Sequence, residues 1–428
     1  MKLLQINPVL RVNTSTGRIM QEIGELAMAN GWESYIAYSG GRDGVKPCRS
    51  HTIPVGDRWS VAWHGVMTRL FDRHGLASDR ATREFIEEIR RIKPDIIHIH
   101  NIHGYFLNYK ILFDYLAQSN IPVVWTVHDC WLYTGHCFYY SFAGCNKWQG
   151  GCNHCPQQRE FPASLLLDRS ARNFADKRAA FTSMPHDKLT IVPVSQWMRS
   201  EMEHSFLNGY DFRVIHNGIN LDTFTPSDTD KEVREIYGLQ GKHLLLGVAS
   251  VWSREKGIDD FVRLSTMLAD DEQLVLVGVS DEIAKRLPAS IKVIRRTENI
   301  GQLAQLYSAA TAFVNLTWQD NYPTVNLEAI ACGTPVVTYR TGGSVESVTD
   351  ETGIVVEQGN LQQVVQAVRT IEQRGKGYYR GRCREYALKH FDKEERYADY
   401  IRLYVERLTS NEESLNAKRS TFIVTKLL

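Results

Sequence analysis

The stretch from Trp318 to Val337, Trp-Gln-Asp-Asn-Tyr-Pro-Thr-Val-Asn-Leu-Glu-Ala-Ile-Ala-Cys-Gly-Thr-Pro-Val-Val, decides the fold of the second half of this chain. It follows an apolar run, residues 312–316, which has the length of a buried strand. Pro323 suits the first turn of a helix, and Gly333 supplies the left-handed residue that commonly ends one. The apolar residues after Gly333 open another strand. The sequence therefore predicts strand, loop, short helix and strand.

Two carboxylates stand out in this stretch: Asp320 on the predicted loop and Glu328 on the predicted helix. The helix start between them, near Thr324 and Val325, offers unpaired N–H groups with a partial positive charge, which can hold phosphate. The carboxylates and the amide of Asn321 can hold hydroxyls, so the pattern suggests a sugar-diphosphate ligand. A solvated Asp and a surface Glu on an ordinary helix would give the same local pattern.

The spacing of Asp320 and Glu328, with seven residues between them, resembles the E-x7-E signature of retaining, family-4 nucleotide-sugar glycosyltransferases. The flanking residues are similar to a bacterial branch of that family that builds surface polysaccharides of the capsule or colanic acid kind. The first acidic residue is Asp rather than Glu, as it often is in that branch. The resemblance implies that Glu328 holds the ribose of the donor nucleotide and that Asp320 contacts the transferred sugar.

The same resemblance implies a reaction. A hexose-type sugar would pass with retention from a nucleotide-diphosphate sugar to a glycan or lipid-linked saccharide acceptor, without a catalytic metal or other cofactor. Two other classes stay open: a nucleotide-sugar epimerase, for which Asp129 is the obvious acid/base candidate, and a non-catalytic protein that binds sugar nucleotides.

Length, composition and charge restrict the number of domains and the classes of partner that we expect. The chain has 428 residues, enough for two domains, with 43% hydrophobic residues and a formal net charge of +1. That charge does not indicate nucleic acid binding. The residues after Met1 turn polar too soon for a signal peptide, and no apolar stretch is long enough to cross a membrane. We expect a cytoplasmic protein.

The chain begins with a strand, a loop, a helix and a second strand, the opening of a Rossmann-type fold. The loop, residues 8–16, is poor in glycine, so NAD binding is not supported. Gly17 matches a family glycine in the loop that approaches the acceptor and the donor phosphates. It is also explained by close helix packing.

Residues 57–75 combine aromatic and basic side chains at helical spacing. Trp59, Trp63 and Phe71 belong to one face, and Arg58 and Arg69 lie elsewhere. Such a helix either lies on an anionic membrane surface or packs its apolar stripe into the core. The resemblance favours contact with the inner face of the membrane, because acceptors in the family are often lipid-linked.

Polar clusters follow two successive predicted strands of the first half, where open α/β sheets bind ligands. The first cluster contains His103 and the second His128 and Asp129. His128 matches the family position whose histidine lies beside the transferred sugar, and His103 is a weaker candidate. His98, inside a strand, is expected to point into the fold.

Four cysteines fall within a short segment: Cys137, Cys145, Cys152 and Cys155. In a cytoplasmic protein this density favours a tetrahedral structural zinc site, with the C-x2-C pair as one half. Free thiols and redox disulfides are the alternatives.

The second half repeats the α/β pattern. Arg254 and Lys256 precede a helix start and suit a diphosphate, a role that the family gives to such residues. Gly342 and Gly343 form a strand-to-helix turn that lets backbone amides approach a ligand. We expect an α/β fold of GT-B type, with two Rossmann-like domains that face each other across a cleft.

The expected domain boundaries follow from the same pattern. They are an acceptor domain (residues 1–220), a linker (221–232), a donor domain (233–391), a helix that returns to the first domain (392–409), and a tail (410–428) that is disordered or contacts a membrane or partner.

Overall fold

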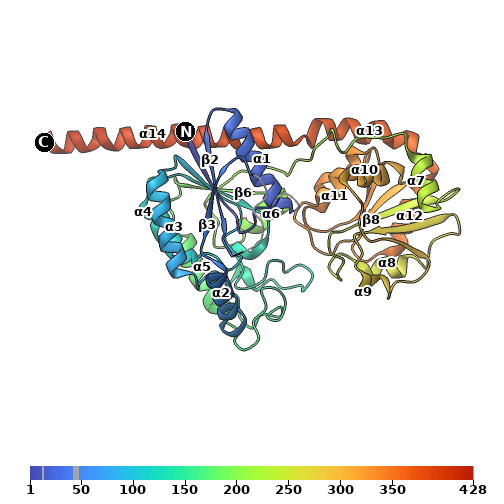
Figure 1. Ribbon diagram of the computed structural model, residues 1–428, viewed down its shortest axis with the longest axis horizontal. Helices are drawn as coiled ribbons and strands as arrows, with labels where there is room; N and C mark the ends of the chain where they lie inside the picture. Colours follow the sequence, from blue (N-terminus) through green and yellow to red (C-terminus); the bar gives the residue numbers. More distant parts are fainter. Residues whose placement is uncertain (12–13, 42–47, 428) are drawn as a thin grey trace. The chain divides into compact units, whose positions relative to one another are not determined.

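The computed structural model of the chain describes residues 1–11, 14–41 and 48–427. Contacts divide the chain into two compact units (Figure 1). Unit 1 comprises Met1–Val194, Arg199–Ile215 and the C-terminal segment from Tyr397, and unit 2 comprises Ser195–Met198 and His216–Arg396.

Unit 1 is built on a seven-stranded parallel sheet in the order β3-β2-β1-β4-β5-β6-β7. Its strands are β1 (Lys2–Ile6), β2 (Glu33–Ser39), β3 (His51–Val55), β4 (Ile96–Ile99), β5 (Val123–Val127), β6 (Leu189–Pro193) and β7 (Asp211–Phe212). The strand order reverses between β1 and β4. In open α/β sheets ligands bind beyond the carboxyl ends of the strands at such a reversal.

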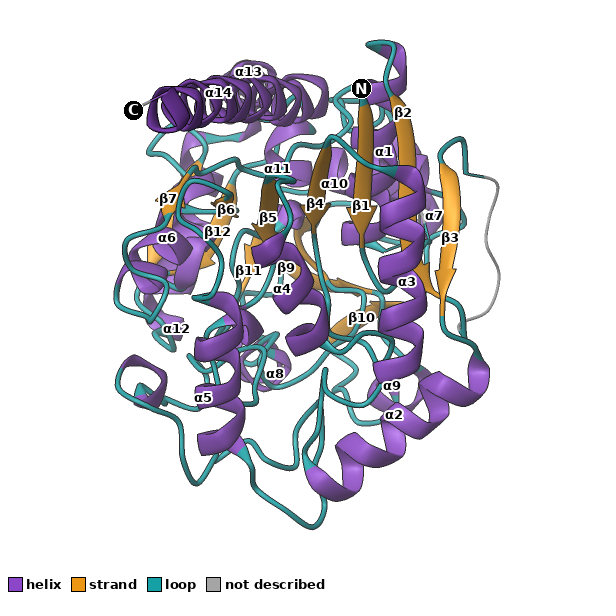
Figure 2. Cartoon of the chain, turned by 90° about the vertical axis from the view of Figure 1, so that its left-hand side faces the viewer, coloured by secondary structure: helices purple, strands orange, loops and turns teal. Residues whose placement is uncertain are grey.

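Helices cover both faces of this sheet. One face carries α3 (Asp79–Ile92), α4 (Tyr109–Gln118) and α5 (Ser170–Phe181), which contact one another in that order (Figure 2). The other face carries α1 (Ser15–Ala29) and the start of α14 (Lys393–Leu427), whose apolar side chains share a core cluster with the sheet. The remaining helices that begin in this part of the chain are α2 (Arg58–Phe71), α6 (Gln196–Glu203), and the short η1 (Cys130–Leu132) and η2 (Lys147–Gln149).

Unit 2 has a six-stranded parallel sheet in the order β10-β9-β8-β11-β12-β13. Its strands are β8 (His243–Val248), β9 (Glu272–Val277), β10 (Ile291–Ile294), β11 (Ala312–Asn315), β12 (Val336–Tyr339) and β13 (Gly353–Val356). Its helices are α7 (Asp230–Tyr237), α8 (Ile258–Leu264), α9 (Asp281–Ala284), α10 (Ile300–Ala309), α11 (Thr324–Ala331), η3 (Gly342–Ser347), α12 (Leu361–Arg374) and α13 (Lys376–His390). The predicted pair of Rossmann-like domains is confirmed.

Hydrogen bonds that involve two buried tyrosines join the C-terminal helix α14 to the sheet of unit 1. The Tyr404 hydroxyl lies 2.6 Å from Nδ1 of His98, and the Thr126 hydroxyl donates to the Tyr400 hydroxyl at 3.0 Å. His98 is fully buried, as the sequence predicted. The last helix of the chain therefore completes the core of the first unit.

The expected disorder from Ser410 onward is not what the structure shows, because α14 continues to Leu427. The polar composition of this segment suggested disorder. However, the chain has no glycine or proline after Gly381, and Glu, Ala, Lys and Arg, all good helix formers, recur there. Nothing in the backbone chemistry ends the helix.

We predict that Tyr404→Phe lowers the free energy of unfolding of unit 1 by about 1–3 kcal/mol, since it leaves a buried nitrogen of His98 without its partner. Urea unfolding of the full chain measures this change. Val405→Ala, on the exposed side of the same helix, is the matched control and should stay close to wild type. An equal effect of the two changes would contradict the role given to the hydroxyl.

Candidate functional site

The carboxylate of Asp320 meets the ammonium of Lys256 at the carboxyl ends of β8 and β11. Lys256 Nζ lies 2.6 Å from Asp320 Oδ2, with the Asp320 side chain 17% exposed and that of Lys256 40% exposed. The two loops are also tied by their backbones, because the Trp318 N–H donates to the Glu255 carbonyl at 2.8 Å. A cation thus stands beside the carboxylate that precedes helix α11.

Two glycines hold the neighbouring loop against this one. A β-carbon on Gly342, whose φ is +50°, would lie 2.1 Å from the carbonyl oxygen of Asp320. A β-carbon on Gly343 would lie 1.9 Å from the carbonyl oxygen of Asn321. The Gly343 N–H also donates to the Asp320 carbonyl at 3.2 Å. This close approach requires glycine at both positions.

Glu328 lies on α11 and is largely buried, at 7% exposure. The Tyr307 hydroxyl from α10 donates to its Oε2 at 3.0 Å. Thr324 and Val325 form the half-buried first residues of α11, after Pro323 as N-cap. The predicted carboxylates therefore stand at the entry loop and on the second turn of one eight-residue helix.

Arg254 is placed less tightly than Lys256. Its guanidinium Nε donates to Asp259 Oδ2 at 3.2 Å, and the side chain is 75% exposed. The left-handed Gly257 (φ +77°) begins α8, and a β-carbon there would lie 2.1 Å from the Leu316 carbonyl oxygen. The loop backbone is thus fixed, while the guanidinium of Arg254 extends from it.

Glu346 was assigned no role from the sequence, and the structure gives it a definite task. Its carboxylate accepts hydrogen bonds from the N–H groups of Gln196 and Trp197, at 2.8 and 2.7 Å, at the start of α6. It also pairs with His216 Nε2 at 3.1 Å, and the His216 ring stacks on Tyr322. Glu346 therefore holds His216 against the ring of Tyr322, the residue that follows Asn321.

In unit 1, His128 follows β5 directly. It is hydrogen-bonded to His100, which follows β4. Burial lowers the pKa of His128 to about 4, so the ring is neutral near pH 7. His103 is close by and pairs with Asp129 at 2.8 Å. The predicted polar clusters at successive strand ends do meet.

Gly17 lies in the first turn of α1, where a β-carbon would lie 2.4 Å from the Arg11 carbonyl oxygen. This contact supports the packing explanation for the glycine. Residues 12 and 13 of the preceding loop lie outside the described residues.

The four cysteines of the insert line one small space together with His136. Yet among the described residues no group of three or more His, Cys, Asp and Glu side chains could hold a metal ion, so structural zinc is not supported. Spacing along the chain does not decide whether sulfur atoms point at a common centre. Cys137, Cys145, Cys152 and Cys155 are all free thiols.

Buried polar contacts anchor the insert. His136 Nδ1 lies 2.8 Å from Asp72 Oδ1, and both side chains are almost completely buried. The Lys177 ammonium donates to the carbonyls of Trp131 and Thr134, at 2.6 and 2.9 Å. Burial lowers the pKa of Lys177 to about 7.

Comparison with known proteins shows that the chain is similar to glycosyltransferases. The model for glycosyltransferase family 4 matches residues 17–223, and that for glycosyl transferases group 1 matches residues 242–373. An Escherichia coli protein named as a colanic acid biosynthesis glycosyl transferase, WcaC, is 25% identical over 86% of this chain and 90% of its own length. The alpha-maltose-1-phosphate synthase of Mycobacterium tuberculosis is 31% identical, over 37% of this chain and 46% of its own.

Solved structures agree on the fold. The sucrose-phosphate synthase of Thermosynechococcus elongatus has a TM-score of 0.69 at 18% identity, over 96% of this chain and 99% of its own. HepE of Anabaena, in complex with UDP, has a TM-score of 0.63 at 14% identity, over 97% of this chain and 100% of its own. The two parallel-sheet units therefore have the GT-B fold of these structures. The first half of the chain is of the glycosyltransferase family 4 type, and the second half is of the glycosyl transferases group 1 type.

We predict that Gly343→Ala lowers the melting temperature and displaces the Asp320 loop, because the added methyl group would overlap the Asn321 carbonyl. The expected cost is about 3 kcal/mol in the free energy of unfolding. Thermal unfolding measures it, with Gly381→Ala as the matched control. Gly381 lies in α13 with nothing near its β-carbon position, so alanine there should raise stability by about 0.5–1 kcal/mol. A neutral Gly343→Ala would contradict the close approach.

Proposed function

We propose that unit 2 binds a nucleotide-diphosphate sugar, and that the chain transfers the sugar with retention to a glycan or lipid-linked saccharide in polysaccharide biosynthesis. The observation that carries the proposal is the Lys256–Asp320 pair at the start of α11, with Glu328 on the same helix. HepE, a structural neighbour, was solved with UDP and with UDP-glucose, and WcaC is named for colanic acid biosynthesis.

Each group of the donor site has a task in this proposal. Breaking the sugar–phosphate bond builds negative charge on the diphosphate, which Lys256, Arg254 and the N–H groups at the start of α11 stabilise. Glu328 accepts hydrogen bonds from the ribose hydroxyls of the nucleotide. Asp320 contacts the transferred hexose. In unit 1, His128 is the residue to which we assign a sugar contact.

We predict that Lys256→Met weakens binding of nucleoside diphosphates about 10- to 100-fold, since it removes a charge-assisted contact to phosphate. Thermal-shift titration with a panel of nucleoside diphosphates and nucleotide sugars measures the change. Lys285→Met, at an exposed lysine of the same unit, is the matched control and should bind as wild type does. Stabilisation of the wild type by no member of the panel would overturn the donor site. Turnover of the donor without an acceptor would indicate an epimerase.

We further propose that helix α2 rests on an anionic membrane surface. Its side chains are arranged opposite to those of a usual surface helix: the buried positions are His64 and Thr68, while Trp59 is 70% and Trp63 58% exposed. His64 is satisfied where it lies, because its Nε2 accepts from the Gly75 N–H at 2.9 Å. No described helix combines the length and the apolar character needed to cross a membrane.

A neighbouring loop extends this apolar surface. Leu165, Leu166 and Leu167 are exposed in succession, and the Leu165 N–H donates to the carbonyl of Arg69 on α2 at 2.7 Å. Helix α2 contains two arginines and no acidic residue. Trp and Leu side chains beside arginines suit the headgroup region of a bilayer with anionic lipids.

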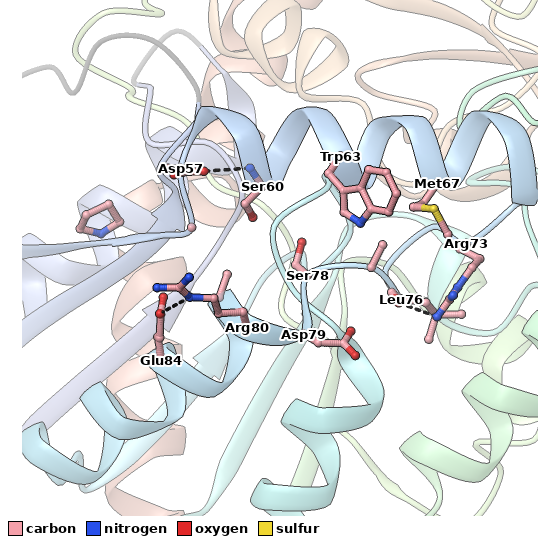
Figure 3. A pocket seen from close by; sticks show the side chains of 14 residues that line it. Asp57, Ser60, Trp63, Met67, Arg73, Leu76, Ser78, Asp79, Arg80 and Glu84 are labelled. Carbon is pink, nitrogen blue, oxygen red and sulfur yellow. Dashed lines mark hydrogen bonds and ion pairs between the residues drawn. The ribbon is translucent and has the colours of Figure 1, made fainter.

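A hollow opens beside this surface, between α2 and the start of α3 (Figure 3). Its volume is about 750 Å³, and Trp63 and Met67 line it together with Arg73 and the carboxylates of Asp57 and Asp79. Aromatic rings, arginines and carboxylates are the groups that hold saccharide hydroxyls. We assign to this hollow the saccharide part of a lipid-linked acceptor.

We predict that replacing Trp59 and Trp63 together with serine lowers binding to vesicles of phosphatidylglycerol and phosphatidylethanolamine about 100-fold, because two large apolar side chains no longer enter the bilayer. Vesicle flotation measures binding. Ile236→Ser, at an equally exposed apolar side chain on α7, is the control and should float like wild type. Equal flotation of the Trp variant and wild type would contradict the proposal that α2 binds the membrane. If the wild type self-associates and the Trp variant does not, the exposed face of α2 binds a second copy of the chain instead.

A further inference from the structure

Trp318 is held through three of its groups by three other segments of unit 2. Its N–H donates to the Glu255 carbonyl at 2.8 Å, in the loop that follows β8. Its carbonyl accepts from the side-chain amide of Gln358 at 3.1 Å, and the same nitrogen donates to the Thr341 hydroxyl at 2.8 Å. Its indole Nε1 donates to Oδ2 of Asp260, on α8, at 2.8 Å. Trp318 thus joins the loops that follow β8, β11, β12 and β13.

The indole contact is made to a buried carboxylate. Asp260 is 4% exposed, and its Oδ2 also accepts from the Tyr339 hydroxyl at 3.0 Å. The other oxygen pairs with Arg263, but the side chain of that arginine is 66% exposed, and water screens such a pair. Hydrogen bonds from the indole and the phenol therefore offset much of the cost of burying this charge.

The segment between the indole and Asp320 is short and bonded to itself. Asp320 lies two residues after Trp318, and the Thr317 hydroxyl donates to the Gln319 carbonyl at 3.0 Å. A displacement of the indole therefore moves Asp320 with it. Glu328 is placed separately, because it lies on α11 and its hydrogen bond comes from α10.

We propose that Asp260 and Trp318 are positioning residues that set Asp320 against the transferred sugar, so that they act on recognition of the sugar and not of the nucleotide. This inference rests on the proposed function, which gives Asp320 the sugar and Glu328 the ribose. It also gives the buried charge a task, because a carboxylate holds the indole N–H more strongly than a neutral acceptor does.

Two matched variants separate positioning from packing. Trp318→Phe keeps an aromatic ring and removes the hydrogen bond that holds the Asp320 loop. Tyr339→Phe removes a hydrogen bond to the same oxygen of Asp260, but from strand β12. We expect the two variants to lower the melting temperature by similar amounts, and only Trp318→Phe to displace Asp320.

Hydrogen exchange of the unliganded full chain, followed by mass spectrometry on a peptide that contains residues 318–322, measures the loop without any donor. We expect exchange about tenfold faster in Trp318→Phe, the size of one ordinary hydrogen bond, and within about twofold of wild type in Tyr339→Phe. Wild-type exchange in Trp318→Phe would overturn the proposal, and so would equally fast exchange in both variants.

Donor binding is the second arm. It compares each nucleoside diphosphate with its glucose derivative: UDP with UDP-glucose, GDP with GDP-glucose, and ADP with ADP-glucose. In Trp318→Phe the affinity for the nucleotide sugar should fall about tenfold, while that for the nucleoside diphosphate should stay within about threefold of wild type. An equal loss for both ligands would overturn the proposal. If the wild type binds no ligand of the panel, the proposed function fails, and the exchange measurement still decides whether the indole holds the loop.

Substitutions at Asp260 test the acceptor itself. Asp260→Asn keeps an oxygen that can accept from the indole and the phenol, so exchange and sugar affinity should stay within about threefold of wild type. Asp260→Leu removes the acceptor and should reproduce Trp318→Phe in both measurements. Equal effects of the two substitutions would show that the acceptor does not hold the loop and would overturn the inference.

Discussion

The backbone of Gly343 lies so close to Asn321 that a single methyl group would fall 1.9 Å from the Asn321 carbonyl oxygen. This approach holds together the loops at the carboxyl ends of β11 and β12. Asp320, Lys256 and the start of α11 take their positions from it, because the Gly343 N–H donates to the Asp320 carbonyl. Glu346 completes the arrangement by binding the start of α6 and His216. The carboxylates of the site are therefore presented on backbone that has little freedom to move.

The Lys256–Asp320 pair adds little to stability. A pair with the lysine 40% exposed contributes roughly 0–1 kcal/mol, because water screens it and two side chains lose freedom. Stability alone thus gives no reason for an ammonium and a carboxylate to stand at a helix start. A ligand that carries both phosphate and hydroxyl groups does give one, since the cation suits the first and the carboxylate the second.

The fold was predictable because parallel strands buried on both faces leave continuous apolar runs between helical segments. The pairing of loops was harder to foresee. Tyr307 lies 21 residues before Glu328, on another helix, and no local pattern joins them. The cysteine insert shows the limit of spacing as an argument, because four thiols near in sequence do not form a metal-binding group among the described residues. The C-terminal segment is polar, but it lacks the residues that end a helix.

The sequence did not show which face of helix α2 is buried or which partners the histidine rings of unit 1 meet. Both depend on hydrogen bonds between residues that are distant in the sequence. An amphipathic pattern shows that two faces of a helix differ, but it does not say which face is buried. In α2 the polar face is buried because His64 finds partners in Ser78 and the Gly75 backbone, which offsets the loss of water. In the same way, the sequence places His128 at a strand end, but it does not show that the ring meets His100 from the neighbouring strand end. Contacts between buried polar groups thus decide which face of α2 is exposed and which strand ends come together.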